Sequence, residues 1–246
     1  MHSYKPPLED FNFILHHFLK IEKENIRGYE DLLPEFTKTI FEEAGKLASE
    51  VISPSNKDGD EQGCILENGI VRTPDSFKLA FDQLRAGGWL SLDIEEEFGG
   101  QNLPLILSTV TNEMFTSANM SLTMYSGLSR GAYSAILLHG SEDQKQMYLP
   151  KLATCEWTGT MNLTEPHCGT DLGLIRTKAI PTENGSYQIS GQKIFISSGD
   201  HDLSENIIHL VLAKTPDALE GVKGISLFVV PKFLAVSYTH LRVHET

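Results

Sequence analysis

The chain has 246 residues, of which 33 are Asp or Glu and 20 are Lys or Arg, so its formal net charge is -13. This acidic balance argues against nucleic acid or an anionic lipid surface as the main partner. The three cysteines are too few and too scattered for a disulfide framework, and no CxxC pair offers a common zinc pattern, so we expect a reducing, cytoplasmic environment.

The first residues, MHSYKPPLEDF, lack the charged-then-apolar layout of a secretion signal, and no apolar run is long enough to span a membrane. The pattern that follows is helical, because apolar residues recur every three or four positions from Leu33 to Val51. Pro34 suits the first turn of that helix. The same spacing from Phe77 to Leu84, after a plausible start at Thr73-Pro74, predicts a second helix.

Two more helices are expected before residue 155. Pro104 opens one of them, with Leu107, Val110 and Met114 on one side. The stretch Ser141–Gln144 fits a capping box, in which the serine hydroxyl and the glutamine side chain satisfy each other's backbone amides. We expect this last helix to continue to about Ala153, with an irregularity at Pro150.

After Trp157 the pattern becomes typical of strands. Residues 157–164, WTGTMNLT, place apolar and hydroxyl or amide side chains on opposite faces. The pair Asn184-Gly185 is a strong hairpin signal between Thr177–Pro181 and Tyr187–Ser190. Further strands are expected at Lys193–Ser197, Ile207–Lys214 and Ile225–Pro231.

Helices first and strands second predict an α+β chain of two domains. We place an all-helical domain, including an N-terminal extension, at residues 1–155 and a β domain at residues 156–234. Residues 235–246, AVSYTHLRVHET, show neither a clean period nor a cap, and we expect a disordered or unrelated tail there.

The stretch Met161–Asp171, MNLTEPHCGTD, contains the densest group of chemically interesting residues, and a metal or thiol site is the first interpretation to weigh. His167 and Asp171 could be metal ligands, but zinc and iron sites need three or four converging groups, and the other histidines show no ligand-like spacing. Cys168 as a nucleophile would need an activating base. The adjacent His167 is poorly placed for that role, since neighbouring residues of an extended chain point to opposite sides.

A ligand-binding loop accounts for more of these residues. The strand delivers the hydroxyl and backbone amides of Thr164 to its tip, and Glu165-Pro166 turns the chain. Gly169 lets the backbone approach a ligand closely, and Thr170 adds a second hydroxyl. Such a loop suits carbonyls, ring nitrogens and phosphates. From composition alone, an ordinary strand-to-loop corner is about equally well supported.

The sequence TEPHCGTD resembles the flavin-loop signature of acyl-CoA dehydrogenases, T-E-P-x-x-G-S-D, with Thr170 in place of the usual serine. Four more segments resemble this family in the family's own order, and together the five cover about Phe36 to Leu234. The N-terminal extension and GDHDLSENIIHLVLAKTPDA resemble the longer-subunit branch of the family. The four further segments are EEEFGGQNLP (Glu95–Pro104), SEDQKQMYLPKL (Ser141–Leu152), GQKIFISSG (Gly191–Gly199) and GISLFVVP (Gly224–Pro231).

The resemblance implies a fold and a reaction. Members of this family have an N-terminal helical domain, a middle antiparallel, barrel-like β domain and a C-terminal four-helix bundle, and they assemble as homo-oligomers. FAD lies between the β domain and the bundle. A glutamate removes the α proton of an acyl-CoA thioester while the β hydride passes to the flavin, and the electrons leave to an electron-transferring flavoprotein.

The resemblance also implies roles for five residues toward the cofactor. Met161, Leu163 and Thr164 match the strand that faces the isoalloxazine ring, where the Thr164 hydroxyl would bond the pyrimidine side and stabilise charge that develops there. Phe195 matches an aromatic side chain that covers the ring, although an aromatic in a strand is usually plain core. Ser197 matches the hydroxyl residue beside the hydride-accepting nitrogen.

Two further positions are implied for the substrate. Gly169 and Thr170 match residues that contact the acyl-CoA. His167 and Cys168 fall on variable positions of the signature, so we assign them no chemistry, and we expect no metal ligand in the chain.

The sequence departs from the family after Leu234, where the bundle should begin but AVSYTHLRVHET follows. We interpret this as a truncation, and the catalytic glutamate would lie in the absent bundle. Glu165 is fixed by the loop motif, and Glu95–Glu97 fit a solvated turn. The expectation is an acyl-CoA dehydrogenase chain without its catalytic base, and the alternative is a non-catalytic fragment or interaction module.

Overall fold

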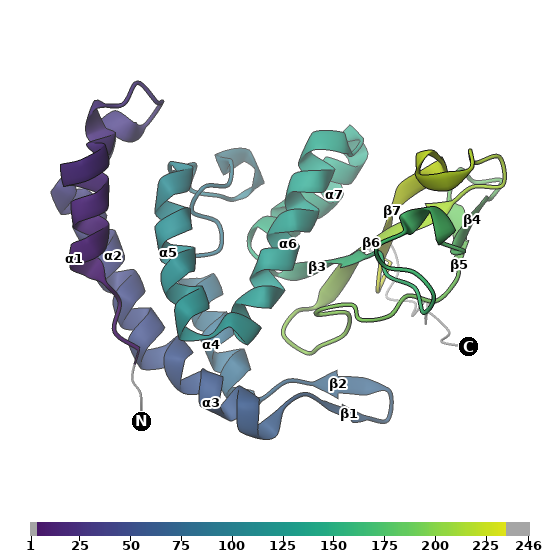
Figure 1. Ribbon diagram of the computed structural model, residues 1–246, viewed down its shortest axis with the longest axis horizontal. Coiled ribbons are helices and arrows are strands. Elements are labelled where there is room, and N and C mark those ends of the chain that lie inside the picture. The colour runs from purple at the N-terminus through teal and green to yellow at the C-terminus, as the bar shows by residue number, and fades with distance from the viewer. Residues whose placement is uncertain (1–3, 235–246) are drawn as a thin grey trace.

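The computed structural model describes residues 4–234, so the predicted tail at 235–246 lies outside the described residues. Helices occupy the first part of the chain and a sheet occupies the last part, at opposite ends of the molecule (Figure 1). We call residues 4–155 the helical region and residues 156–234 the β region. Within the described part of the chain, no helix is both long and apolar enough to cross a membrane.

The helical region contains seven α-helices among its described residues, together with short 3-10 and π turns. A two-stranded hairpin of β1 and β2 projects between the third and fourth of them (Figure 1). The helices are α1 (Leu8–Asn12), α2 (Pro34–Leu47), α3 (Ser53–Gln62), α4 (Asp75–Ala86), α5 (Leu105–Ala118), α6 (Met120–His139) and α7 (Glu142–Ala153). The turns are the π segments Phe13–Leu19 and Ala48–Ile52 and the 3-10 segments Ile21–Lys23, Tyr29–Asp31 and Glu96–Phe98, and the hairpin strands are β1 (Ile65–Glu67) and β2 (Ile70–Arg72).

The expected helix starts are largely confirmed. Pro34 lies in the first turn of α2, where its missing amide leaves no internal hydrogen bond unmade. The capping box of α7 is complete, since the Ser141 hydroxyl accepts from the Gln144 amide while the Gln144 side chain accepts from the Ser141 amide. Pro150 lies inside α7, which nevertheless continues to Ala153.

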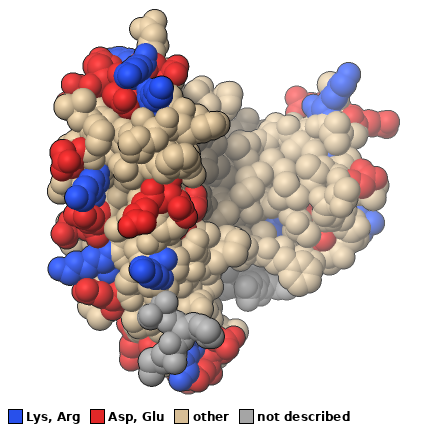
Figure 2. Space-filling model, turned by 60° about the vertical axis from the view of Figure 1, so that its left-hand side comes forward, with Lys and Arg blue, Asp and Glu red and all other residues tan. Residues whose placement is uncertain are grey.

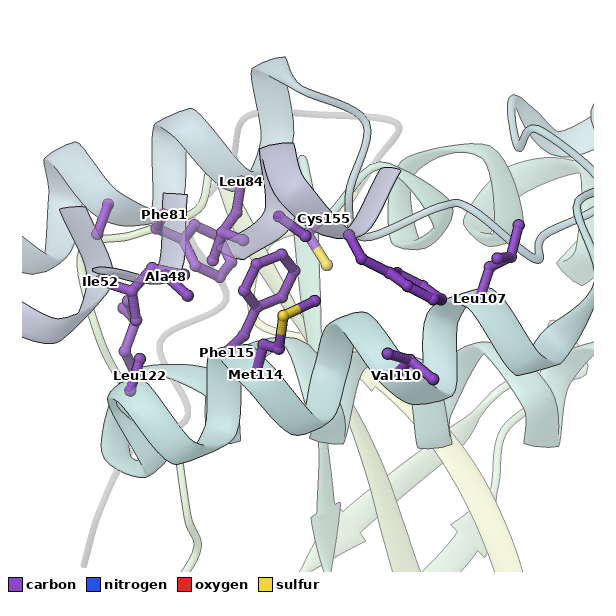
Figure 3. Close-up of a cluster of buried hydrophobic side chains, with 14 of the residues drawn as sticks. Ala48, Ile52, Phe81, Leu84, Leu107, Val110, Met114, Phe115, Leu122 and Cys155 are labelled. Atoms are coloured by element: carbon purple, nitrogen blue, oxygen red, sulfur yellow. The ribbon is translucent and has the colours of Figure 1, made fainter. Parts of the chain in front are cut away.

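The core of the helical region lies between α2, α4 and α5 and the π segment Ala48–Ile52. In Figure 3, side chains of α5, among them Met114 and Phe115, lie against Phe81 of α4 and Ile52 of that segment. These side chains are almost completely buried. At about 25 cal/mol per Å² of apolar surface removed from water, such a contiguous cluster is the main source of stability for these helices.

The β region contains one five-stranded sheet and two short 3-10 turns. The strand order is β3-β6-β4-β5, and β7 also pairs with β6. The strands are β3 (Trp157–Asn162), β4 (Lys178–Pro181), β5 (Tyr187–Ser190), β6 (Asn206–Lys214) and β7 (Ile225–Pro231), and the turns are Leu172–Leu174 and Gly221–Gly224.

Two expectations for this sheet are corrected. The pairing is mixed rather than antiparallel, because β6 runs parallel to both β3 and β4. A long connection separates β3 from β6, and only connections of that kind allow parallel neighbours. The expected strand at Lys193–Ser197 does not form, since Phe195 has φ 55°, which is incompatible with an extended chain.

The sheet is joined to the helices through α6 and α7. Ile208 and Leu210 of β6 pack in one buried cluster with Tyr133 of α6 and Leu149 of α7. Gly159 of β3 approaches α6 so closely that an added Cβ would lie 2.4 Å from the Ala132 Cβ atom. The two regions therefore form one packed body, from which the far end of the sheet extends.

Candidate functional site

The predicted ligand-binding loop is a tight turn at the end of β3. The Glu165 amide donates to the Cys168 carbonyl oxygen at 2.8 Å, and the Cys168 amide donates to the Glu165 carbonyl oxygen at 3.1 Å. Pro166 takes the second position of the turn, which its fixed φ favours. After the turn the chain runs back past Thr164, and a Cβ atom added to Gly169 would lie 3.3 Å from Thr164 Cγ2. It thereby brings the predicted cofactor residue Thr164 against the predicted substrate residue Gly169.

The side chain of Glu165 is buried and connects this turn to Arg176 and Thr177. Its side chain is 3% exposed. One carboxylate oxygen accepts hydrogen bonds from the Thr177 amide and hydroxyl at 3.0 and 2.6 Å, and the other accepts from the Arg176 amide at 2.7 Å. Burial alone would raise the pKa of Glu165, but these donors and Lys193 outweigh it and lower the pKa to about 2. Glu165 is therefore a charged structural anchor over the whole physiological pH range.

A second segment, residues 191–197, lies against the turn. The Ile194 amide donates to the Thr164 carbonyl oxygen at 3.0 Å. The Lys193 ammonium donates to the Leu163 carbonyl oxygen at 3.0 Å and to Glu165 Oε1 at 2.9 Å. These bonds place Phe195 next to the end of β3, although the two segments are about thirty positions apart in the sequence.

Phe195 is the most exposed large apolar side chain of the described residues, at 89%. Its φ of 55° is rare for a bulky residue and is maintained only where the surroundings impose it. The expectation that an aromatic here would be plain core is wrong for this chain. An exposed ring in a constrained backbone is suited to stacking on a flat ligand.

The seven predicted site residues are therefore brought together in part. Thr164, Gly169 and the Phe195 segment are in contact, and Leu163 joins them through its carbonyl oxygen. Met161, 38% exposed on β3, and Ser197 belong to the same two segments, but no side-chain hydrogen bond of residues 4–234 connects them with the others. Thr170 follows Gly169 and is exposed.

The uncharged donors of this surface are unpaired within the described part of the chain. The side-chain hydroxyls of Thr164, Thr170 and Ser197 belong to half-buried or exposed residues and make no hydrogen bond to any residue between 4 and 234, whereas the buried charges Glu165 and Lys193 bind each other. The neutral donors and the exposed Phe195 ring therefore belong to two segments that are hydrogen-bonded to each other. That combination can hold a flat polar ring through hydrogen bonds and stacking.

Glu165, His167 and Cys168 each offer one possible metal ligand, and these atoms lie within 4.8 Å of one another. Asp171, the other candidate ligand in the sequence, accepts a hydrogen bond from the Gly173 amide. His167 Nε2 lies 2.9 Å from the Leu174 carbonyl oxygen and 3.7 Å from Glu165 Oε2. A metal ion would have to displace these existing partners of His167 and Glu165.

The predicted site is an open surface. Two surface hollows of about 350 and 320 Å³ lie around Ala86 of α4, and none of the seven predicted residues lines them. Sequence reasoning missed the two buried partners at the site, Lys193 and Thr177. A lysine directly before the apolar run Ile194–Ile196 was the available signal for the first, while nothing local marked the second.

Comparison with known proteins adds an independent observation. Residues 34–156 match the family described as acyl-CoA dehydrogenase, N-terminal domain, and residues 160–244 match the acyl-CoA dehydrogenase middle domain. The chain is 46% identical over 234 residues to 3-methylmercaptopropionyl-CoA dehydrogenase of Ruegeria pomeroyi, covering 95% of this chain and 40% of that protein. It is 43% identical over 242 residues to a butyryl-CoA dehydrogenase of Syntrophomonas wolfei, covering 94% of this chain and 39% of the relative.

One solved structure is also similar. The acyl-CoA dehydrogenase of Bacillus anthracis, crystallised in complex with FAD, aligns with a TM-score of 0.65 and 27% identity, covering 84% of this chain and 32% of that chain. The present chain spans about 40% of the length of the curated relatives described above.

Proposed function

This chain belongs to the acyl-CoA dehydrogenase family of oxidoreductases, and from that premise we propose that it carries the flavin-contacting part of an FAD-dependent enzyme that desaturates an acyl-CoA thioester. The observation that carries the proposal is the surface around Thr164. Its hydroxyls make no side-chain hydrogen bond within residues 4–234, and the segment that carries the exposed Phe195 is bonded to Thr164 through the Ile194 amide.

The residues present fit FAD. The Thr164 and Ser197 hydroxyls would donate to the polar edge of the flavin ring, and Met161, Leu163 and Phe195 would supply apolar contact to its faces. When bound, FAD supplies the acceptor for the hydride taken from the acyl chain. Gly169 and Thr170 would contact the acyl-CoA, where a glycine leaves room for close approach of the ligand.

No residue of this chain is assigned as the catalytic base. Of the two acids in the loop motif, Asp171 accepts from the Gly173 amide, while the Glu165 carboxylate is occupied by Thr177, Arg176 and Lys193 and its pKa is held near 2. An effective base needs a pKa closer to the working pH and a free lone pair. The proposal therefore places the base in a C-terminal helical bundle like that of the family.

We extend the proposal to the assembly, the electron acceptor and the location of the complete protein. The complete protein would form a homo-oligomer, pass its electrons to an electron-transferring flavoprotein and work in the cytoplasm. The three free cysteines fit a reducing compartment. The proposed substrate class is acyl-CoA thioesters.

The test is to titrate the purified 246-residue chain with FAD, following flavin fluorescence, and then to add butyryl-CoA or 3-methylmercaptopropionyl-CoA. We expect weak, saturable FAD binding and no bleaching of the flavin. T164V and F195A should each weaken FAD binding, while T116V, which removes an exposed hydroxyl from α5, should not. No affinity for FAD in the wild-type chain would contradict the proposal. A stoichiometric yellow complex that acyl-CoA bleaches would show that the chain carries its own base.

A further inference from the structure

Lys193 and Glu165 form an ion pair whose side chains are 8% and 3% exposed. Among the ion pairs of residues 4–234, it is the only one in which both side chains are this deeply buried. Neither residue is among the proposed flavin contacts, yet each lies in one of the two segments that carry them. The pair therefore lies where it can influence both segments of proposed flavin contacts.

The pair connects the two contact segments. Lys193 Nζ donates both to Glu165 Oε1 and to the Leu163 carbonyl oxygen, one residue before Thr164. The neighbouring Ile194 amide donates to the Thr164 carbonyl oxygen. Glu165 is in turn held by Thr177 and the Arg176 amide, so Lys193 is fixed on a rigid partner.

The same tie explains how Phe195 keeps its positive φ. No regular strand supports residues 191–197, and Phe195 itself is exposed, so its backbone is constrained by the bonded residues on either side, including the turn after it in which the Gly199 amide donates to the Ile196 carbonyl oxygen. Lys193 and Ile194 are the residues that are bonded to the end of β3. Loss of the tie would release Phe195 from its position beside Thr164.

We propose that the Glu165–Lys193 pair is the positioning device of the flavin surface, fixing Thr164 and Phe195 relative to each other and balancing the charge beneath them. The inference rests on the proposed function. A buried ion pair contributes little net stability compared with an apolar replacement, so a role in positioning gives this pair a purpose that stability alone does not.

The charges of the pair predict a change in the ratio of the affinities for oxidised and reduced FAD, which a purely structural role does not predict. K193M leaves Glu165 as an uncompensated negative charge, and E165Q leaves Lys193 as an uncompensated positive charge. Reduced flavin carries more negative charge than oxidised flavin near neutral pH. K193M should therefore lower the affinity for reduced FAD more than that for oxidised FAD, and E165Q should do the opposite.

The experiment measures the dissociation constants of oxidised and dithionite-reduced FAD for the 246-residue wild-type chain and for K193M, E165Q and the double variant. Circular dichroism at the titration temperature confirms folding. We expect K193M to weaken oxidised FAD binding by about tenfold or more, the size seen when partners that orient ligating groups are removed. The double variant should remain weak, because the tie is lost, but its ratio of the two affinities should return to the wild-type value.

K178M, which removes an exposed lysine from β4, is the matched control and should leave both affinities unchanged. If K193M does not fold, K193R takes its place, with weakened binding and an unchanged affinity ratio expected. A wild-type chain that binds FAD while K193M, or K193R in its place, binds it equally well would overturn this inference alone. A wild-type chain without FAD affinity would overturn the proposed function and this inference with it.

Discussion

The helical region and the β region are stabilised in different ways. The helical region packs apolar side chains of several helices into one contiguous cluster, as Figure 3 illustrates. Both regions bury polar side chains, but within residues 4–234 hydroxyls such as Ser108 and Thr111 of α5 bond only the preceding turn of their own helix. Those of the β region bond partners in other segments, among them Thr158, Thr160, Glu165, Thr177, His201 and Asn206. Apolar packing gives a tolerant scaffold, whereas a polar network fixes particular loops and is sensitive to the loss of single atoms.

The surfaces of the two regions differ as well. Figure 2 shows acidic and basic side chains spread over the face of the helical region, while the smaller lobe formed by the β region is largely uncharged in that view. That lobe includes exposed apolar residues such as Phe195, Leu174 and Leu227.

The largest effect is expected at the contact between the two regions. In G159A the new methyl group would meet Ala132 Cβ at 2.4 Å and the Ser129 backbone at 3.3 Å, so β3 and α6 would have to separate. We expect the free energy of unfolding to fall by about 2–3 kcal/mol in urea titrations. G127A, a helix position of α6 with nothing within 4 Å of the added atom, should be neutral or stabilising by up to about 1 kcal/mol. Equal effects of the two variants would show that the regions are not closely packed there.

A pH change should affect the β region more than the helical region. Burial lowers the pKa of His201 from its ordinary value of 6.5 to about 4. The unfolded chain binds the proton first, so stability is full above pH 6.5 and falls as the pH drops toward 4, by about 2 kcal/mol at pH 5 and about 3 kcal/mol at pH 4 for this residue. The Asp202 and Glu165 carboxylates, with pKa values of about 2, stay charged throughout that window.

Two tryptophans allow this comparison to be measured, because Trp89 packs against Phe115 in the helical region and Trp157 lies near Tyr148 at the start of β3. W157F and W89F each leave one fluorescent reporter. Urea unfolding at pH 7 and pH 5 should show the larger loss with Trp157 as the reporter. H201Q should reduce that difference, whereas H139Q at the exposed end of α6 should not. If the free energy of unfolding of H201Q falls between pH 7 and pH 5 by as much as that of the parent chain, another group causes the acid sensitivity.

A smaller effect is expected at the hydrogen bonds between the regions around Asp202. Asp202 Oδ1 accepts from the Thr73 amide and hydroxyl at 3.0 and 2.7 Å, and Oδ2 accepts from Lys78 at 2.9 Å. D202A would leave the Thr73 amide unpaired before α4, and we expect a loss of about 1.5 kcal/mol in the free energy of unfolding. D217A removes an exposed carboxylate of the β region and should change stability by less than about 0.5 kcal/mol. A neutral D202A would mean that water replaces these bonds without loss.

The smallest effect belongs to a single helix start. S141A removes the hydroxyl that accepts from the Gln144 amide and should lower the free energy of unfolding by about 1 kcal/mol. S141D keeps an acceptor at the same position and should retain most of the stability. Because the capping box lies at the surface of the helical region, FAD binding should be the same in both variants. A change in FAD affinity would mean that α7 influences the flavin surface.

Local signals in the sequence predicted the helix starts, the Asn184-Gly185 hairpin and the strands β6 and β7. The parallel pairing of β3 with β6 could not be predicted, because it joins segments more than forty residues apart. A strand is predicted at Lys193–Ser197, but Lys193 and Ile194 bond to the end of β3 and Phe195 turns out of the extended conformation.

The site was predicted through its motif rather than through its contacts. The signature pointed to Thr164, Gly169 and Phe195, which the structure brings together at one end of the β region. The buried partners below them depend on the side chain of Lys193 reaching across from a distant segment. No local pattern encodes that contact, since it exists only after the sheet has formed.

Hydrogen–deuterium exchange of the 246-residue chain with and without FAD tests the central claim most directly, namely that one end of the β region is the flavin-binding surface. The account predicts slower amide exchange in residues 161–170 and 191–197 when FAD is added, with Pro34–Leu47 of α2 unchanged. Protection confined to the helical region, or no protection in either segment at saturating FAD, would contradict it.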